Sequence, residues 1–431
     1  MSDDPRPDEL PPLRREGLAR RLERVVATGN RFAGTPGEAR CRDLILDQFA
    51  AARLADVRLE DFRYLAYEPE SASCVAVGDG WSIPCAALQY SADGSAEGEA
   101  VYLGACRPED LDAVEARGVD LAGRVAVAHS YHTWLVAPQL AGKGIAALVN
   151  VGETPDNLVG QFPVSFYPIG LEQPWEGRVQ PFPGVTIEAQ AARRLLSLMT
   201  AGRVRLRVEH RGRYVEKTAA NVVGEIPGTA DERVVVGAHY DTQLEGPGAA
   251  DNATGVATVL ELARLWRRLE PRRTVVLCAF GVEELAAWGS YSYVVRHAEE
   301  AERTVGMVNL DALGLPFPGK RVVVADAAMT GFARESAARC GFQPEGEIDA
   351  SLYAWGDHNP FIDAGVPSCW LWRYPPQHPY YHSAGDVLRY VDLDRIVDVA
   401  TASAYLALRL AQLPELELGR SRPTQTFAAI P

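Results

Sequence analysis

The sequence predicts an α/β fold in which a mixed, mostly parallel sheet lies between two helical layers, with a β-rich domain inserted into it. From Asn221 onward, short apolar runs of strand length alternate with segments of helix length. Strands that are apolar on both faces are typical of parallel sheets covered by helices on both sides. Between Glu68 and His210 the runs are shorter and are broken by glycine and proline. The length of 431 residues suits two or three domains.

The composition excludes several classes of partner. The chain is 47% hydrophobic and 23% charged, and 43 Lys+Arg against 57 Asp+Glu give a formal net charge of −14. Nucleic acids and anionic membranes are bound by dense positive charge, so neither is an expected partner. No apolar run reaches the roughly 18 residues of a membrane-spanning helix. The N-terminal segment lacks the apolar core of a secretory signal, and the seven cysteines are dispersed singly, so we expect a cytoplasmic protein.

Residues 1–67 are expected to form the first part of the main α/β domain. Residues 1–12 are polar and proline-rich, which predicts a loose arm. Helices are expected over 13–27 and 37–52, with the turn-forming run GTPG between them. The alternating run VRLEDFRYLAY, residues 57–67, then predicts a strand.

Residues 68–210 are expected to form the inserted β-rich domain. The run LAGRVAVAHS leads through WLVAPQLAGKGIAALVNVGE, which predicts a strand, a helix and a second strand in succession. The segment FPGVTIEAQAARRLLSLM then predicts another strand and helix. We refer to residues 68–210 as the inserted region.

Residues 211–431 are expected to complete the main domain. Between the first two predicted strands, apolar residues at spacings of three, four and seven predict a helix from Asp251 to about Leu269. A last helix is expected over 395–413. The predicted strands are 234–240, 274–280, 305–311, 321–326 and 367–372.

Acidic and imidazole side chains follow the carboxyl ends of these strands, where ligands bind in open α/β sheets. A single Asp or His at a strand end is more often a helix cap or a satisfied core group, and a Glu–Glu pair at a helix start is usually solvated. Coincidence does not explain why so many acidic and imidazole side chains occur along the chain, each at or just past the end of a predicted strand. The positions are His239, Asp251, Glu283 with Glu284, Asp311 and His382.

These residue types are ligands of zinc and similar divalent metals. Three ligand carboxylates carry a charge of −3, and clustering them without cations is costly because like charges resist common ionisation. Two divalent ions with one bridging hydroxide would bring the site to neutrality, and two ions that share a carboxylate lie about 3.5–4 Å apart. The sequence therefore predicts two divalent ions, with zinc favoured and manganese or cobalt as alternatives. A glutamate beside a ligand glutamate would be free to act as a base.

Seven sequence runs together resemble the co-catalytic di-zinc aminopeptidase family, whose relatives include secreted bacterial leucyl aminopeptidases and glutamate carboxypeptidase II. The runs are RFAGTPG, HYD, GAADNATG, EELAAWGS, NLDALG, GDHNPF and YYHSAGD. The resemblance implies the three-layer zinc-aminopeptidase fold, with residues 1–67 and 211–431 as its catalytic domain.

The resemblance also implies a role for each site residue. Asp251 would bridge the two metals. His239 and Asp311 would complete one metal site, and Glu284 and His382 would complete the other. Glu283 would be the general base, and Asp241 would fix the orientation of His239.

Two further regions are similar to known elements of such enzymes. The segment SLYAWGDH resembles the stretch in which a tyrosine hydroxyl stabilises the oxyanion, which implies that role for Tyr353, supported by Asp357 and His358. Gly356 stands where a serine commonly precedes the Asp-His pair. The inserted region resembles a protease-associated domain, with a plain insertion of no functional role as the alternative. Arg373 is a candidate partner for a substrate carboxylate, or else an ordinary surface arginine.

The leading hypothesis is a metal-dependent hydrolase of amide or peptide bonds that acts as an aminopeptidase. The alternative is a cytoplasmic non-peptide amidohydrolase or deaminase acting on a C–N bond of a small metabolite, because most relatives are secreted and this chain shows no signal. The complete ligand set argues against a non-enzymatic binding protein. His239 argues against a glutaminyl-cyclising relative, which would lack it. The expected partner is a peptide or a small amide-like substrate, and homo-oligomerisation is left open.

Overall fold

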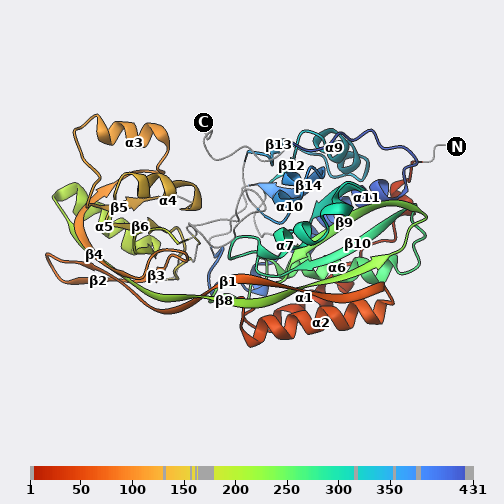
Figure 1. The fold of residues 1–431 in the computed structure, drawn as a ribbon, viewed down its shortest axis with the longest axis horizontal. Helices are drawn as coiled ribbons and strands as arrows, with labels where there is room; N and C mark the ends of the chain where they lie inside the picture. Colours follow the sequence, from red (N-terminus) through yellow and green to blue (C-terminus); the bar gives the residue numbers. More distant parts are fainter. Residues whose placement is uncertain are drawn as a thin grey trace.

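A computed structural model describes residues 4–129, 133–155, 158–160, 163, 179–314, 319–352, 356–374 and 380–422. Figure 1 shows two lobes along the long axis of the molecule, with the inserted region at one end and the rest of the chain at the other. The helices are α1 Arg15–Val26, α2 Pro36–Ala52, α3 Pro108–Glu115, α4 Thr133–Gly142, α5 Ala189–Ala201, α6 Ala253–Trp266, α7 Trp288–Arg296, α8 Ala298–Ala301, α9 Thr330–Arg339, α10 His358–Asp363 and α11 Leu393–Gln412, with short 3-10 helices at Pro7–Glu9 and Leu388–Tyr390.

The strands extend through both lobes. They are β1 Ala55–Ala76, β2 Trp81–Ile83, β3 Cys85–Ala87, β4 Gly94–Tyr102, β5 Val125–Ala128, β6 Ala147–Val151, β7 Gly184–Ile187, β8 Arg205–Ile226, β9 Ala230–His239, β10 Arg273–Phe280, β11 Thr304–Asn309, β12 Lys320–Ala325, β13 Gly346–Asp349 and β14 Ser368–Tyr374.

The main lobe has the predicted three-layer α/β/α architecture. Its strand order is β13-β12-β14-β11-β9-β10-β8, and β14, β11, β9 and β10 are mutually parallel. Helices α1, α2, α6, α9 and α11 pack on one face of the sheet, and α7 and α10 pack on the other. The fold class expected from the sequence is confirmed.

The uniformly apolar strands follow from this double coverage. In β9, Val234 and Val236 face the larger helical layer, whereas Val235 faces the layer of α7 and α10. The strand period of two therefore requires an apolar side chain at every position. The predicted helices also form at their expected places, and the α6 N-terminus is capped by Asn252, whose side chain accepts a hydrogen bond from the Gly255 N–H.

The two lobes are joined by a long antiparallel ribbon of β1 and β8 (Figure 1). Each strand has 22 residues, and the pairing runs from Ala55 opposite Glu225 to Ala76 opposite Leu206. Residues 67 and 210 both lie inside this ribbon. Beyond it, β4, β5, β6 and β7 form a parallel set, with α3 and α4 packed on one face and α5 on the other.

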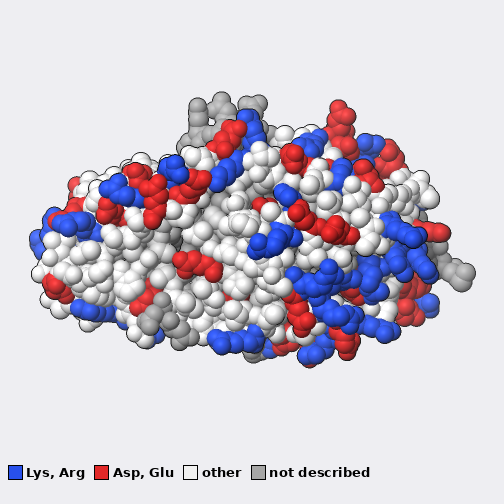
Figure 2. Space-filling model, turned by 90° about the horizontal axis from the view of Figure 1, so that it is seen from below, with Lys and Arg blue, Asp and Glu red and all other residues white. Residues whose placement is uncertain are grey.

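Charge is unevenly distributed over the surface. Figure 2 shows Lys and Arg side chains gathered on one half of the face seen from below, which is the side of α1 and α2 in Figure 1. Helix α1 alone carries Arg15, Arg20, Arg21 and Arg24. This face is locally basic although the whole chain has a net charge of −14. Among the described helices, none combines the length and apolar character needed to cross a membrane.

Candidate metal centre and active site

The five predicted metal ligands lie together at the carboxyl ends of the central strands. Asp251 stands between two groups, and its two carboxylate oxygens face different histidines. Its Oδ1 lies 3.1 Å from His239 Nε2, and its Oδ2 lies 3.4 Å from His382 Nε2. Asp311 Oδ1 joins the first group, 3.4 Å from His239 Nε2, and Glu284 Oε2 joins the second, 3.1 Å from His382 Nε2. The arrangement provides two ligand sets that share one carboxylate.

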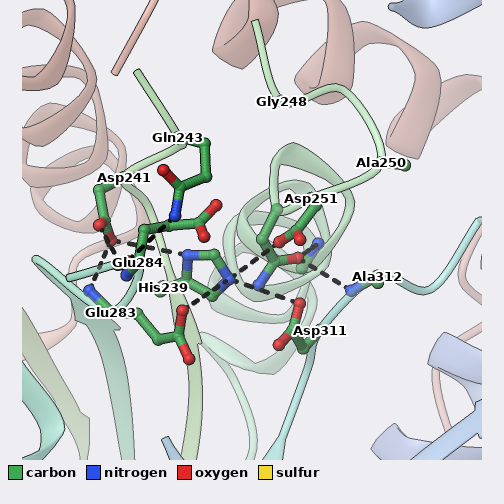
Figure 3. A network of polar contacts seen from close by, with 12 residues as sticks. His239, Asp241, Gln243, Gly248, Ala250, Asp251, Glu283, Glu284, Asp311 and Ala312 are labelled. Carbon is green, nitrogen blue, oxygen red and sulfur yellow. Dashed lines mark hydrogen bonds and ion pairs between the residues drawn. The ribbon is translucent and has the colours of Figure 1, made fainter. Parts of the chain in front are cut away.

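Figure 3 shows His239 surrounded by Asp251, Asp311, Glu283 and Asp241. Glu283 Oε2 lies 4.0 Å from His239 Nε2, so this second glutamate borders the first ligand group. Ligand atoms of His239, Asp251 and Glu284 lie within 4.8 Å of one another, which is compact enough for a metal ion. All of these side chains are buried or nearly so. Asp311 Oδ1 accepts no hydrogen bond from the described residues, which leaves it available as a ligand.

Asp241 holds the segment that carries both glutamates. Its Oδ1 accepts a hydrogen bond from the Glu283 N–H at 3.0 Å, and its Oδ2 accepts one from the Glu284 N–H at 3.1 Å. The distance from its Oδ1 to His239 Nδ1 is longer, at 3.6 Å. Asp241 therefore lies beside the imidazole without a hydrogen bond of normal length to it, and its shorter contacts position the backbone of Glu283 and Glu284.

Asp386 acts in the same way on the segment that carries the bridging aspartate. Its two oxygens accept hydrogen bonds from the Ala250 N–H at 2.8 Å and the Asp251 N–H at 3.0 Å. On the other side of Asp251, the Asn252 side chain donates to the Leu310 carbonyl at 2.9 Å. These contacts connect the start of α6 to the segments that carry His382 and Asp311.

Arg31 organises the loop after β9 from inside the protein. Its side chain is fully buried and donates to the carbonyl oxygens of Tyr240, Pro247 and Gly248 at 2.8, 2.6 and 2.9 Å. Gly248 has a φ of +54°, and a Cβ there would lie 2.2 Å from Thr242 Cγ2. Only glycine therefore fits where the loop turns toward Asp251.

The electrostatics of the group favour cations. Burial raises the pKa values of Glu283, Glu284 and Asp311, and neighbouring carboxylates raise them further. Burial acts in the same direction on Asp251, but the His239 and His382 side chains lower its pKa below the usual range. Neighbouring carboxylates overcome the effect of burial on His382 and raise its pKa to about 10. Without metal, protons must offset the clustered negative charge, so the set fits divalent ions.

The remaining predicted residues lie close by or outside the described residues. Tyr353 lies outside them. Asp357 and His358, at the start of α10, are completely buried, and the Asp357 carboxylate accepts no hydrogen bond from the described residues that meets normal geometry. Burial raises the pKa of Asp357 to about 7 and lowers that of His358 to about 3. Arg373 forms an ion pair with Asp398, so its guanidinium already has a carboxylate partner.

Sequence reasoning did not assign roles to Arg31, Asp386 or Gln243. Arg31 and Asp386 lie within the runs RFAGTPG and YYHSAGD, which was the available signal. Gln243 Nε2 donates to the Glu284 carbonyl at 3.1 Å, and nothing in the local sequence pattern indicates that contact.

The profile described as Peptidase family M28 matches residues 221–407, the part that holds all five candidate ligands. Aminopeptidase YwaD of Bacillus subtilis (strain 168) is 30% identical over 217 residues, which is 47% of this chain and 48% of that protein. The chain thus spans about half the length of this curated relative.

Two solved structures share the fold over nearly the whole chain. The aminopeptidase from Aneurinibacillus sp. strain AM-1 superposes with a TM-score of 0.70 and 22% identity, over 95% of this chain and 97% of that one. The Peptidase M28 precursor from Shewanella amazonensis SB2B gives a TM-score of 0.73 and 20% identity, over 95% of each chain. At these identities the likeness concerns the fold.

Proposed function

We propose that the chain is a metallo-aminopeptidase of peptidase family M28, whose profile matches residues 221–407, and that it binds two divalent ions, with zinc as the expected metal. The observation that carries the proposal is the position of Asp251, whose two oxygens face His239 and His382 separately. A carboxylate shared in this way is the arrangement by which two ions are held about 3.5–4 Å apart. Relatives named as an aminopeptidase and as zinc metalloproteases support the same conclusion.

The ligands divide between two sites. His239, Asp311 and Asp251 Oδ1 would hold one ion, and His382, Glu284 and Asp251 Oδ2 the other. When bound, such ions polarise a substrate carbonyl and lower the pKa of water from 15.7 toward about 7.

Glu283 would move the protons. It is not needed as a ligand, and its carboxylate lies at the edge of the first group. Burial raises the pKa of Glu283 in the metal-free protein, and two bound cations would favour its ionised form, which is the form that accepts a proton. Glu283 would accept a proton from the attacking water and later deliver one to the leaving amine nitrogen. A general base of this kind contributes about 10²–10⁴-fold in rate.

Product analysis by mass spectrometry tests this function. Zinc-loaded protein is incubated with matched peptides that carry either a free or an acetylated N-terminus. Stepwise loss of N-terminal residues from the free peptides alone is the expected result. Protein treated with a chelator is the control and should be inactive. Failure of fully zinc-loaded protein to cleave any free peptide would overturn the proposal, and hydrolysis of acylated amino acids instead would indicate a small-molecule amidohydrolase.

A further inference from the structure

The inserted region contributes buried side chains to the segment that carries Glu283 and Glu284. We propose that Gln89 and Tyr90 are positioning residues for these two glutamates, so that the inserted region forms part of the framework of the metal centre. The inference rests on the proposed function, because it assigns Glu284 to the metal site of His382 and Glu283 to proton transfer.

The first link is a chain of two amides. Gln89 Nε2 donates a hydrogen bond to Gln243 Oε1 at 2.7 Å, and Gln243 Nε2 donates to the Glu284 carbonyl at 3.1 Å. Gln89 is 0% exposed and Gln243 is 2% exposed. Figure 3 shows Gln243 directly above Glu284, joined to it by this hydrogen bond. Since buried amides must be paired, removing Gln89 would leave Gln243 Oε1 without a donor, and the Gln243 side chain would then be free to release the Glu284 carbonyl.

The second link is the hydroxyl group of Tyr90. This oxygen lies 3.1 Å from the carbonyl oxygen of Leu285, the residue after Glu284, and 2.8 Å from that of Leu65. It also accepts a hydrogen bond from Trp288 Nε1 at 3.2 Å. One buried hydroxyl thus connects the inserted region, strand β1 and both ends of the segment 285–288.

The segment 282–288 needs contacts from the surrounding structure to keep its backbone conformation. Val282, Ala286 and Ala287 have φ angles of 60°, 89° and 52°, in the left-handed region that side chains other than glycine rarely adopt. Such conformations persist only where packing and hydrogen bonds from neighbouring residues hold the backbone in place. The apolar side chains of the segment provide part of that support, because they share one buried cluster with the inserted region, which includes Leu88, Tyr90, Leu103, Phe182, Val282, Leu285 and Trp288.

The two metal sites depend on these contacts to different degrees. In the division of ligands proposed above, Glu284 belongs to the His382 site. On the other side, His239 and Asp311 follow β9 and β11, and neither is hydrogen-bonded to Gln89, Gln243 or Tyr90 within the described residues. Loss of the amide chain should therefore weaken one metal site more than the other.

The test measures zinc binding separately from activity. Gln89→Leu removes the first link while keeping the side-chain size, and Gln139→Leu makes the same change at an exposed position of the inserted region. Zinc content per chain is measured across a series of metal buffers, together with kcat and KM on a peptide substrate. Losing a partner bonded directly to a ligand side chain costs about 10–100-fold in metal affinity, and Gln89 acts through Gln243, so we expect Gln89→Leu to lower the affinity for one zinc by about 10-fold and to leave the other site and the Gln139→Leu protein unchanged.

Tyr90→Phe provides a second test that keeps the ring in the core. Loss of the hydroxyl should lower kcat several-fold with little change in KM, because Glu283 is misplaced while substrate contacts remain. Wild-type affinity at both zinc sites and wild-type kcat in the two variants would overturn the proposal, as would equal weakening of both sites. If the wild-type chain binds two zinc ions but cleaves no peptide, the proposed function fails, while the zinc measurement still decides the role of Gln89.

Discussion

Replacing Asp386 with asparagine should damage the metal centre although Asp386 is not a ligand. Its two carboxylate oxygens each accept one backbone hydrogen bond, from the Ala250 and Asp251 N–H groups. An asparagine keeps one acceptor oxygen but places an NH₂ donor against the second N–H. Because the Asp386 side chain is only 2% exposed, water cannot replace the lost acceptor.

The size of the effect follows from these two contacts. Leaving one buried donor unsatisfied costs about 1–3 kcal/mol, and the remaining hydrogen bond loses the strength that the charged acceptor gave it. One kcal/mol shifts the melting temperature by about 2–4 °C in domains of 150–250 residues, and the main domain here is larger, so a total of about 2–3 kcal/mol corresponds to a fall of about 4–6 °C. Displacement of Asp251 affects both metal sites at once, so affinity for both ions should fall by about 10–100-fold.

The assay combines thermal unfolding of the metal-free protein with zinc titration. Asp231→Asn is the matched control, since it removes the same charge at an exposed residue that is paired with Arg303 and should cost no more than about 1 kcal/mol. If Asp386→Asn melts within a degree of the control and binds both zinc ions as tightly as the wild type, the carboxylate does not hold the Asp251 backbone in the way described.

Three other perturbations test separate parts of the site. Glu283→Gln should retain two zinc ions by metal analysis but lose about 10²–10⁴-fold in kcat. A variant whose kcat is close to that of the wild type would show that Glu283 is not the general base. In metal-free protein the pKa of His382 is raised from 6.5 to about 10, so its stabilising contribution is complete below pH 6.5 and is lost as the pH rises toward 10. The melting temperature of chelated protein should therefore fall across that range, and zinc should reduce the dependence by holding His382 neutral. Gly248→Ala should cost about 1–3 kcal/mol by overpacking, because the new Cβ would meet Thr242 and the Asp251 carbonyl; an unchanged unfolding curve in denaturant would contradict this.

The main strands and the positions of the five candidate ligands were predictable because each depends on local sequence. Apolar runs marked the strands, and the strand ends then gave the positions of His239, Glu284 and Asp311 in one row at the sheet edge. The Asp251 position followed from the start of a helix with clear apolar periodicity. The rule that parallel strands present their carboxyl ends together brought these side chains to one edge, and the resemblance to di-zinc aminopeptidases implied how they divide between two metals.

The supporting residues were not predictable in this way because their partners are distant in sequence. Asp386 contacts a backbone 135 residues away, and Arg31 contacts one 209 residues away. A lone buried arginine or aspartate has no periodic signature, and its partners are backbone atoms that every residue possesses. The contact of Gln89 with Gln243 spans 154 residues and joins two lobes that the sequence pattern separates. Such roles become visible only when the fold brings the two segments together.

The supporting groups also explain why the centre should require metal. Asp241 and Asp386 hold backbone N–H groups with both oxygens, and each adds a buried negative charge beside the ligands. With Asp251, Glu283, Glu284 and Asp311 these make six carboxylates, and the Arg31 guanidinium adds one positive charge that acts on Asp241, Asp251 and Asp386. If all six were ionised and His239 and His382 were neutral, as metal ligation requires, this group would carry a charge of −5, and two divalent ions would reduce it to −1. Burial, together with the neighbouring Asp251 carboxylate, raises the pKa values of Glu284 and Asp311 in the metal-free centre, so metal binding should stabilise the fold as a whole.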